Sequence, residues 1–174
     1  QARTAVFVAD ADGVLGLLAI SDPLRPEAAE AVTVLRRMGL HTLMLSGDAP
    51  AVAAEIGRQA GVDEARGGVL PDAKAEAITQ LRASGRVVGM LGDGINDAPA
   101  LAAADVGIAM GAMGTDVAKD AAAIVVADDD FATIVDAVEQ GRAVFDNVRK
   151  SLLYLLSGNV AEILLVAVAV LAGM

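Results

Sequence analysis

The feature that most constrains this chain is an apolar run over residues 152–174. It reads LLYLLSGNVAEILLVAVAVLAGM and contains one ionisable residue, Glu162. An α-helix rises about 1.5 Å per residue, so the run is long enough to cross a hydrocarbon core of roughly 30 Å. The alternative is a buried core helix, but the length of the run and its basic flank favour a membrane span. Arg142, Arg149 and Lys150 precede it, which predicts that the preceding domain is cytoplasmic.

Charge and composition narrow the function classes. The formal net charge is −10, from 23 acidic and 13 basic side chains. Nucleic-acid binding depends on clustered Lys and Arg, so we expect no nucleic-acid partner. The acidic balance suits a phosphate that arrives with its own Mg²⁺. With no Cys and a single His, His41, the chain has no disulfide, thiolate metal site, His-cluster metal site or cysteine nucleophile.

Ahead of the apolar run, short β-rich segments alternate with Ala-rich helical patterns. The sequence predicts strands at 5–9, 14–20, 42–45, 86–91, 106–109 and 123–126, and helices at 27–38, 51–60, 73–84, 98–103 and from 131 through 150 into the apolar run. The first two strands are joined by residues 10–13, a combination typical of a hairpin turn. The alternation of later strands with helices predicts an α/β fold, a parallel sheet with helices on both faces.

Polar residues cluster where two of the expected strands end, which is where α/β folds bind ligands. Ser-Gly-Asp at 46–48 follows one strand, and Gly-Asp-Gly-Ile-Asn-Asp at 92–97 follows another. Asp93 and Asp97 could face one cation, because the intervening glycine imposes little steric cost. Lys74, near the start of its helix, adds a positive charge for a phosphoryl group. This set suits Mg²⁺-assisted phosphoryl transfer.

The order of these motifs resembles the phosphorylation domain of P-type ATPases, within the haloacid dehalogenase-like superfamily. The motifs are DPLRP at 22–26, SGD at 46–48, PDAK at 71–74, GDGINDAPAL at 92–101, ADVGIAMG at 104–111 and GTDVAKDAA at 114–122. The first is similar to the family's hinge motif, and the resemblance covers nearly the whole chain. It implies a haloacid dehalogenase-like Rossmannoid fold followed by a stalk and one transmembrane helix.

The resemblance also implies roles for individual residues. Asp93 matches the carboxylate that binds the catalytic Mg²⁺, and Asp97 matches its partner in that loop. Lys74 matches the lysine that contacts the phosphoryl group. Mg²⁺ is then the implied cofactor and ATP the implied substrate.

Four further positions match phosphate- or nucleotide-binding residues of the family. Ser46 stands where the family often has Thr, and Gly47 and Asp48 complete that motif. Asn96 belongs to the same loop as Asp93. We therefore expect Ser46 to act with Lys74, Asp93 and Asp97 in catalysis.

The resemblance divides the chain into four parts. Residues 1–20 would be hairpin strands at the end of the nucleotide-domain and hinge region, 21–138 the phosphorylation domain, 139–151 a stalk helix and 152–174 the transmembrane helix. The family's Asp-Lys-Thr-Gly-Thr nucleophile motif does not occur in these 174 residues. We therefore expect a C-terminal piece of a longer pump, inactive alone, whose partners are the remaining domains and membrane helices of that pump, the transported cation and membrane lipid.

Two other function classes remain open. VFVADADGV at 6–14 resembles the nucleophile motif of soluble haloacid dehalogenase-like phosphatases, with Asp10 as nucleophile and Asp12 as general acid. Against this reading, the chain turns at once after Gly13 into an apolar run that would pair with the first strand as a hairpin. A non-catalytic, membrane-anchored regulator would retain the fold without a nucleophile.

The apolar run suggests the transported ion. Asn159 and Glu162 are three residues apart and share one helix face. An acid at bilayer depth is costly and usually takes part in ion binding. YLLSGNVAEILL resembles the fifth membrane helix of calcium-pump-type ATPases, and oxygen ligands favour hard cations such as Ca²⁺. The short stretch between SGD and LPDAK instead resembles heavy-metal pumps, which is the alternative.

Overall fold

The computed structural model describes residues 4–11, 13–20 and 24–173. It divides into two compact units, Gln1–Val135 and Asp136–Met174, which are described separately below. Asp12 of the expected turn, and Asp22 and Pro23 of the hinge-like motif, lie outside the described residues.

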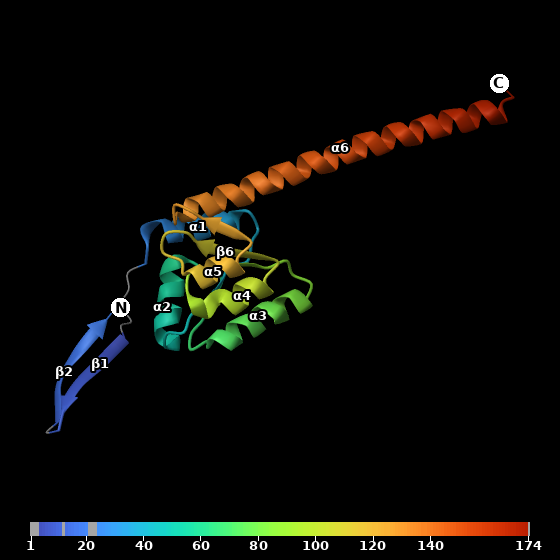
Figure 1. Cartoon of the computed structure of the whole chain (residues 1–174). Coiled ribbons are helices and arrows are strands. Elements are labelled where there is room, and N and C mark those ends of the chain that lie inside the picture. The colour runs from blue at the N-terminus through green and yellow to red at the C-terminus, as the bar shows by residue number, and fades with distance from the viewer. Residues whose placement is uncertain (1–3, 12, 21–23, 174) are drawn as a thin grey trace. The chain divides into compact units, whose positions relative to one another are not determined.

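The first two strands form an antiparallel hairpin. β1 (Thr4–Asp10) pairs with β2 (Gly13–Ile20), and the register brings Asp10 opposite Gly13. The Gly13 N–H donates to the Asp10 carboxylate at 3.0 Å, a bond across the turn. Among the described residues β1 has no strand partner other than β2, so the hairpin is a sheet of its own (Figure 1). The predicted hairpin is confirmed.

The rest of the first unit is an α/β domain with parallel strands, as predicted (Figure 1). Its elements are α1 (Pro26–Arg37), β3 (Leu43–Leu45), α2 (Pro50–Ala60), β4 (Glu64–Arg66), α3 (Pro71–Ala83), β5 (Gly89–Gly92), a 3₁₀ turn (Ile95–Asp97), α4 (Ala98–Ala103), β6 (Val106–Met110), α5 (Asp116–Ala121) and β7 (Ile124–Val126). β3 pairs in parallel with β4, and β6 lies between β5 and β7 with both pairings parallel.

Both faces of the three-stranded sheet are covered by helices. Because side chains alternate along a strand, β6 sends Ala109 to one face and Met110 to the other. Ala109 packs with Leu101 of α4 and Ala118 of α5, all fully or almost fully buried. Met110 packs with Val126 of β7 and Ile134, on the helix that follows β7. The core is therefore small aliphatic side chains, as the scarcity of aromatic residues requires.

Three details differ from the sequence-based expectations. β5 begins at Gly89 rather than residue 86, because the backbone N–H of Val88 is bound by the Asp105 carboxylate. β4 and α5 were not predicted. β4 is three residues long and reads Glu-Ala-Arg, so it carries no apolar run, and α5 spans only six residues.

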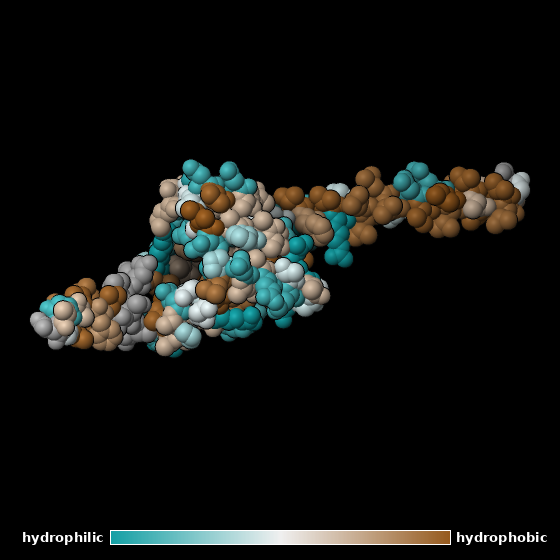
Figure 2. All heavy atoms as spheres, turned by 60° about the horizontal axis from the view of Figure 1, so that its bottom comes forward, coloured by the Kyte–Doolittle hydropathy of each residue, from teal (hydrophilic) through white to brown (hydrophobic). Residues whose placement is uncertain are grey.

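The last helix, α6, runs without interruption from Phe131 to Leu171. Its first turns are anchored in the first unit by Ile134 and Val135, which are buried. Its most apolar stretch is not buried at all and is long and apolar enough to cross a membrane. Apolar side chains dominate the outer part of α6 on the face seen in Figure 2. The prediction of a helix continuous with the apolar run is confirmed.

Candidate functional site

Lys74 and Asp97 form the polar centre of the site predicted at the strand ends. Lys74 lies in the first turn of α3, where its charge opposes the helix dipole. The Lys74 Nζ donates to Asp97 Oδ1 at 2.7 Å, and only 15% and 13% of the two side chains are exposed. The structure therefore brings two predicted residues, 23 positions apart in the sequence, into a direct ion pair that is largely sheltered from solvent.

The loop that carries Asp93 folds back tightly on the end of β5. The Gly94 N–H donates to Asp97 Oδ2 at 3.3 Å, so both carboxylate oxygens of Asp97 are engaged. A Cβ added to Gly92 would lie 2.6 Å from the Cβ of Asp97, so only glycine permits this approach. Asp93 and Asn96 are exposed at the same loop, and the Asp93 carbonyl accepts the Thr115 N–H at 2.9 Å.

Ser46, Gly47 and Asp48 follow β3 as predicted and form their own hydrogen-bonded turn. The Ser46 hydroxyl donates to Asp48 Oδ2 at 2.9 Å and accepts the Asp48 N–H at 3.1 Å. The Ser46 N–H donates to the carbonyl of Arg66, at the end of β4. Among the described residues, no hydrogen bond joins this turn directly to Lys74 or Asp93. A phosphate would therefore have to bridge the two parts of the predicted site.

The donor set suits Mg²⁺ at Asp93 better than at Asp97. Asp93 offers an exposed carboxylate, the hard oxygen ligand that Mg²⁺ prefers. Both oxygens of Asp97 already bind the Lys74 ammonium and the Gly94 N–H, so this residue holds the loop in place. The described residues contain no cluster of three or more acidic or His side chains suited to a metal. Waters and phosphate oxygens would have to supply the remaining ligands.

Asn159 and Glu162, the predicted transport ligands, both lie on α6 and are exposed. The helix is regular through this region, so their spacing of three residues places them on one face. Asn159 lies nine residues and Glu162 twelve residues beyond Lys150, the last basic residue of the sequence.

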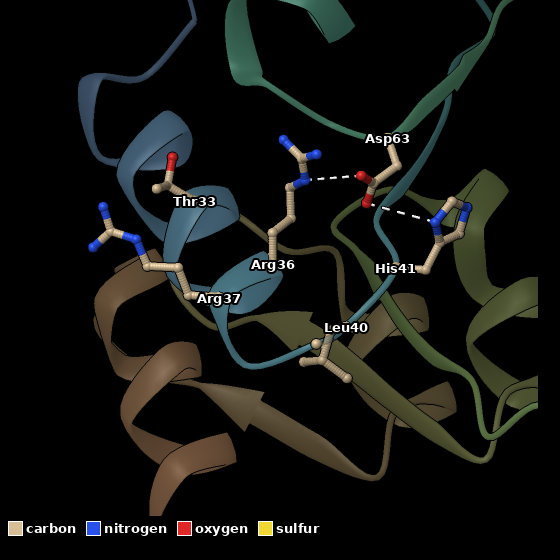
Figure 3. A pocket seen from close by; sticks show the side chains of 7 residues that line it. Thr33, Arg36, Arg37, Leu40, His41 and Asp63 are labelled. Atoms are coloured by element: carbon tan, nitrogen blue, oxygen red, sulfur yellow. Dashed lines mark ion pairs between the residues drawn. The ribbon is translucent and has the colours of Figure 1, made fainter.

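A second polar cluster lies where α1 leads into β3 (Figure 3). Arg36 Nε approaches Asp63 Oδ1 to 2.8 Å, and His41 Nδ1 lies 3.6 Å from Asp63 Oδ2. These side chains line an open cavity of about 530 Å³ together with Thr33, Arg37 and Leu40. The N–H and hydroxyl of Thr42 also donate to Asp63, at 2.8 and 2.9 Å. Asp63 therefore ties α1 to the start of β3, and this contact is structural.

We expect Asp63 to make folding sensitive to acid. Hydrogen bonds from Thr42, and then the Arg36 charge, hold the pKa of Asp63 below its ordinary value. Because the folded-state pKa is the lower one, the stability it contributes is present above the unfolded-state value of about 3.9 and is lost as pH falls through the folded-state pKa. Asp63→Asn should lower the melting temperature at pH 7 and matter progressively less towards pH 2.

Thermal melts of the wild type and Asp63→Asn between pH 2 and 8 measure this difference. Asp120→Asn is the matched control, because the Asp120 side chain is exposed and makes no hydrogen bond or ion pair with the described residues. A constant gap between Asp63→Asn and the wild type across the whole pH range would contradict the assignment.

Two residues that support the site were not identified from sequence. Thr115 donates its N–H to the Asp93 carbonyl, and its hydroxyl caps α5 by accepting the Ala118 N–H at 3.3 Å. Asp129 is buried and binds the loop that leads to Thr115. Thr115 lies in the motif GTDVAKDAA, but Asp129 is the middle of three consecutive aspartates, and nothing in that run distinguishes it.

Comparisons with known proteins agree with the fold and with the family resemblance seen in the sequence. Residues 1–105 match the family model for haloacid dehalogenase-like hydrolases. A manganese-exporting P-type ATPase from Mycobacterium tuberculosis is 43% identical over 166 residues, covering 95% of this chain. Calcium-transporting ATPase 1 from Bacillus cereus is 40% identical over 188 residues, covering 91% of it.

A solved structure is also similar, that of a zinc-transporting PIB-type ATPase in the E2.Pi state. It superposes with a TM-score of 0.74 and 40% sequence identity over 85% of this chain. The chain spans only part of these proteins: 23% of the manganese exporter, 21% of the calcium-transporting ATPase and 24% of the zinc transporter.

Proposed function

Because the chain belongs to the haloacid dehalogenase-like hydrolase family, and within it to the P-type ATPases, we propose that it is the phosphorylation domain and adjoining membrane helix of a cation pump. The pump would couple ATP hydrolysis, through an aspartyl-phosphate, to cation transport across a membrane. The observation that carries this proposal is the sheltered Lys74–Asp97 pair beside the exposed carboxylate of Asp93, at the end of β5. The similarity over 95% of the chain to a manganese exporter supports it.

Each residue of the site would have its own role in phosphoryl transfer. Lys74 provides an ammonium that would turn from Asp97 to a phosphoryl oxygen, since both acceptors are anionic. Asp97 then continues to hold Gly94 and the loop. The Ser46 hydroxyl and the Gly47 and Asp48 amides would bind phosphate oxygens, and Asn96 would act from the Asp93 loop. Bound at Asp93, Mg²⁺ would neutralise charge on the transferred phosphoryl group.

The membrane part of the proposal concerns α6. We propose that its apolar part spans the bilayer, with the α/β domain on the cytoplasmic side because Arg142, Arg149 and Lys150 precede the span. The other membrane helices and domains of the pump would be its partners, together with lipid. The exposed apolar surface of α6 supports the membrane span.

For the transported ion we propose a hard divalent cation bound by oxygen. Asn159 and Glu162 offer an amide and a carboxylate oxygen, and the chain has no Cys for a soft metal. The names of the relatives include manganese, zinc, calcium, silver and copper transport, so they do not single out the Ca²⁺ expected from sequence. Mn²⁺ fits the same oxygen ligands and is the named cargo of a relative 43% identical to this chain.

A heavy-metal pump is the second candidate. The chain between Ser-Gly-Asp and α3 is short, and the similar zinc-transporting structure supports this reading. The phosphatase alternative has less support, because β1 belongs to an antiparallel hairpin. Asp10 lies at its turn, in a different sheet from β5.

The 174-residue chain in detergent should bind Mg²⁺ through Asp93 and turn over neither ATP nor a phosphate ester. The reason is a phosphate and Mg²⁺ site in a chain without the family's nucleophile motif. Calorimetric Mg²⁺ titration and release of p-nitrophenol from p-nitrophenyl phosphate measure the two properties. Hydrolysis that disappears in Asp10→Asn would instead establish a phosphatase.

A further inference from the structure

Asp129 differs from its two neighbours in the run Asp128–Asp130. Asp128 and Asp130 are exposed, whereas only 8% of Asp129 is exposed. Its φ of 54° lies in the left-handed region, and it is the one non-glycine residue with a positive φ in the described part of the chain. That conformation is unfavourable for most L-residues, although Asp and Asn tolerate it when local hydrogen bonds compensate. The backbone is therefore arranged to turn this carboxylate inward.

The carboxylate of Asp129 binds the loop that follows β6. Its Oδ1 accepts the Ala112 N–H at 3.1 Å, and its Oδ2 accepts the Met113 N–H at 2.6 Å. Two charge-assisted bonds to successive amides fix both the position and the orientation of this loop. The Asp129 carbonyl also accepts a hydrogen bond from Arg25 Nη1 at 3.2 Å.

The same loop, residues 111–115, is hydrogen-bonded at its end to the backbone of Asp93. At its start, the Gly111 N–H donates to the Val126 carbonyl at 2.8 Å, and at its end the Thr115 N–H donates to the Asp93 carbonyl at 2.9 Å. The loop is also closely folded, since a Cβ on Gly114 would overlap the Met110 carbonyl oxygen. A loop held this closely cannot shift at Ala112 and Met113 without moving Thr115.

We propose that Asp129 is a positioning residue for the Mg²⁺ site, acting on Asp93 through the loop 111–115. The inference rests on the proposed function, since it assumes that Asp93 binds Mg²⁺. Asp129 itself touches neither metal nor phosphate. It lies two residues before α6, so it also joins the start of the membrane helix to the loop that supports Asp93.

Asp129→Gly is the sharpest test, because glycine adopts a positive φ without strain and only the carboxylate is lost. Residues that orient metal ligands from outside the coordination sphere usually contribute about 10–100-fold to metal affinity, so we expect a Mg²⁺ Kd raised about tenfold. The amide chemical shifts of Asp93 and Gly94, followed by NMR as Mg²⁺ is added to the full chain in detergent micelles, report that Kd at the site itself.

Asp130→Asn is the matched control. The Asp130 carboxylate accepts the Ala132 N–H at 2.9 Å and so stabilises the start of α6 without contacting the loop. The Mg²⁺ Kd of Asp130→Asn should equal that of the wild type. If Asp129→Gly does not fold, Asp129→Asn carries the test, since Asn tolerates the left-handed conformation and keeps one acceptor oxygen. There we expect a Mg²⁺ Kd raised about threefold, less than in Asp129→Gly because one of the two hydrogen bonds to the loop can be kept.

The outcomes separate the inference from the proposed function. A wild-type chain whose Asp93 and Gly94 signals do not respond to Mg²⁺ would overturn both. A wild-type chain that binds Mg²⁺, with an unchanged Kd in the folded Asp129 variants, would overturn the inference alone. In that case a lowered melting temperature would mark Asp129 as purely structural.

Discussion

Asp93→Asn should abolish phosphoenzyme formation from ATP in the full-length pump that we propose contains this chain. The substitution removes a full negative charge from the only exposed carboxylate of the 92–97 loop, and the neutral amide is a much weaker ligand for Mg²⁺. Removing one group that stabilises transition-state charge typically costs about 10²–10³ in rate, and removing the ligand of a catalytic metal should cost more. Acid-stable incorporation of ³²P from labelled ATP measures the loss.

Two further variants, Ser46→Ala and Asp120→Asn, provide the comparisons for Asp93→Asn. Ser46→Ala removes one hydroxyl, which here is hydrogen-bonded to Asp48. The free-energy barrier to phosphorylation should therefore rise by about 2–4 kcal/mol, which slows the reaction without abolishing it. Asp120→Asn makes the same chemical change as Asp93→Asn at an exposed position on α5, and it should behave as the wild type. Normal turnover in Asp93→Asn would refute the metal site.

Glu162→Gln should lower cation-dependent ATPase activity and leave phosphorylation from inorganic phosphate intact. Glu162 carries the one negative charge of the apolar run, and a carboxylate attracts a divalent cation more strongly than the neutral amide of Gln does. Loss of the charge should raise the half-maximal cation concentration by at least about tenfold, or about 1.4 kcal/mol. In P-type ATPases, the family this chain resembles, phosphorylation from inorganic phosphate requires an empty ion site, so it should survive. The measurement is ATPase rate against free Mn²⁺, Ca²⁺, Mg²⁺ and Zn²⁺.

Two variants on the same helix complete the experiment. Glu139→Gln makes the same change outside the apolar run and should not alter the ion dependence. Asn159→Ala removes a neutral ligand and should weaken ion affinity less than Glu162→Gln. A shift for Mn²⁺ or Ca²⁺ but not Zn²⁺ would favour a hard-cation pump, and the reverse would favour a heavy-metal pump. If Glu162→Gln changes the response to none of these cations, Glu162 is not a ligand.

The parts of the fold predicted correctly are those with strong local signals. Residues 131–171 carry a long helical pattern that becomes predominantly apolar, and the structure has one helix there. The hairpin was predictable because its turn residues separate two apolar strands. β4 was not predictable, since Glu-Ala-Arg becomes a strand only by pairing with β3. The helices at the sheet faces were expected as a class, but no local signal indicated the short α5.

The sequence by itself determined the residue types of the site and their order along the chain. Ser46, Lys74, Asp93 and Asp97 occur in motifs at strand ends and helix starts, and local propensities are enough to place such motifs at the carboxyl ends of parallel strands.

Only the tertiary structure decided which of those residues are paired with each other and which one is exposed. Lys74 and Asp97 are 23 residues apart, and their contact forms because α3 packs against α4, the helix that begins directly after Asp97, around a shared apolar core. That pairing leaves Asp93 as the exposed carboxylate. In the same way, the backbone at Asp129 alone turns one of three identical neighbours inward. Side-chain direction at a turn depends on the φ of that residue and on distant hydrogen-bond partners, and neither is encoded in the local pattern.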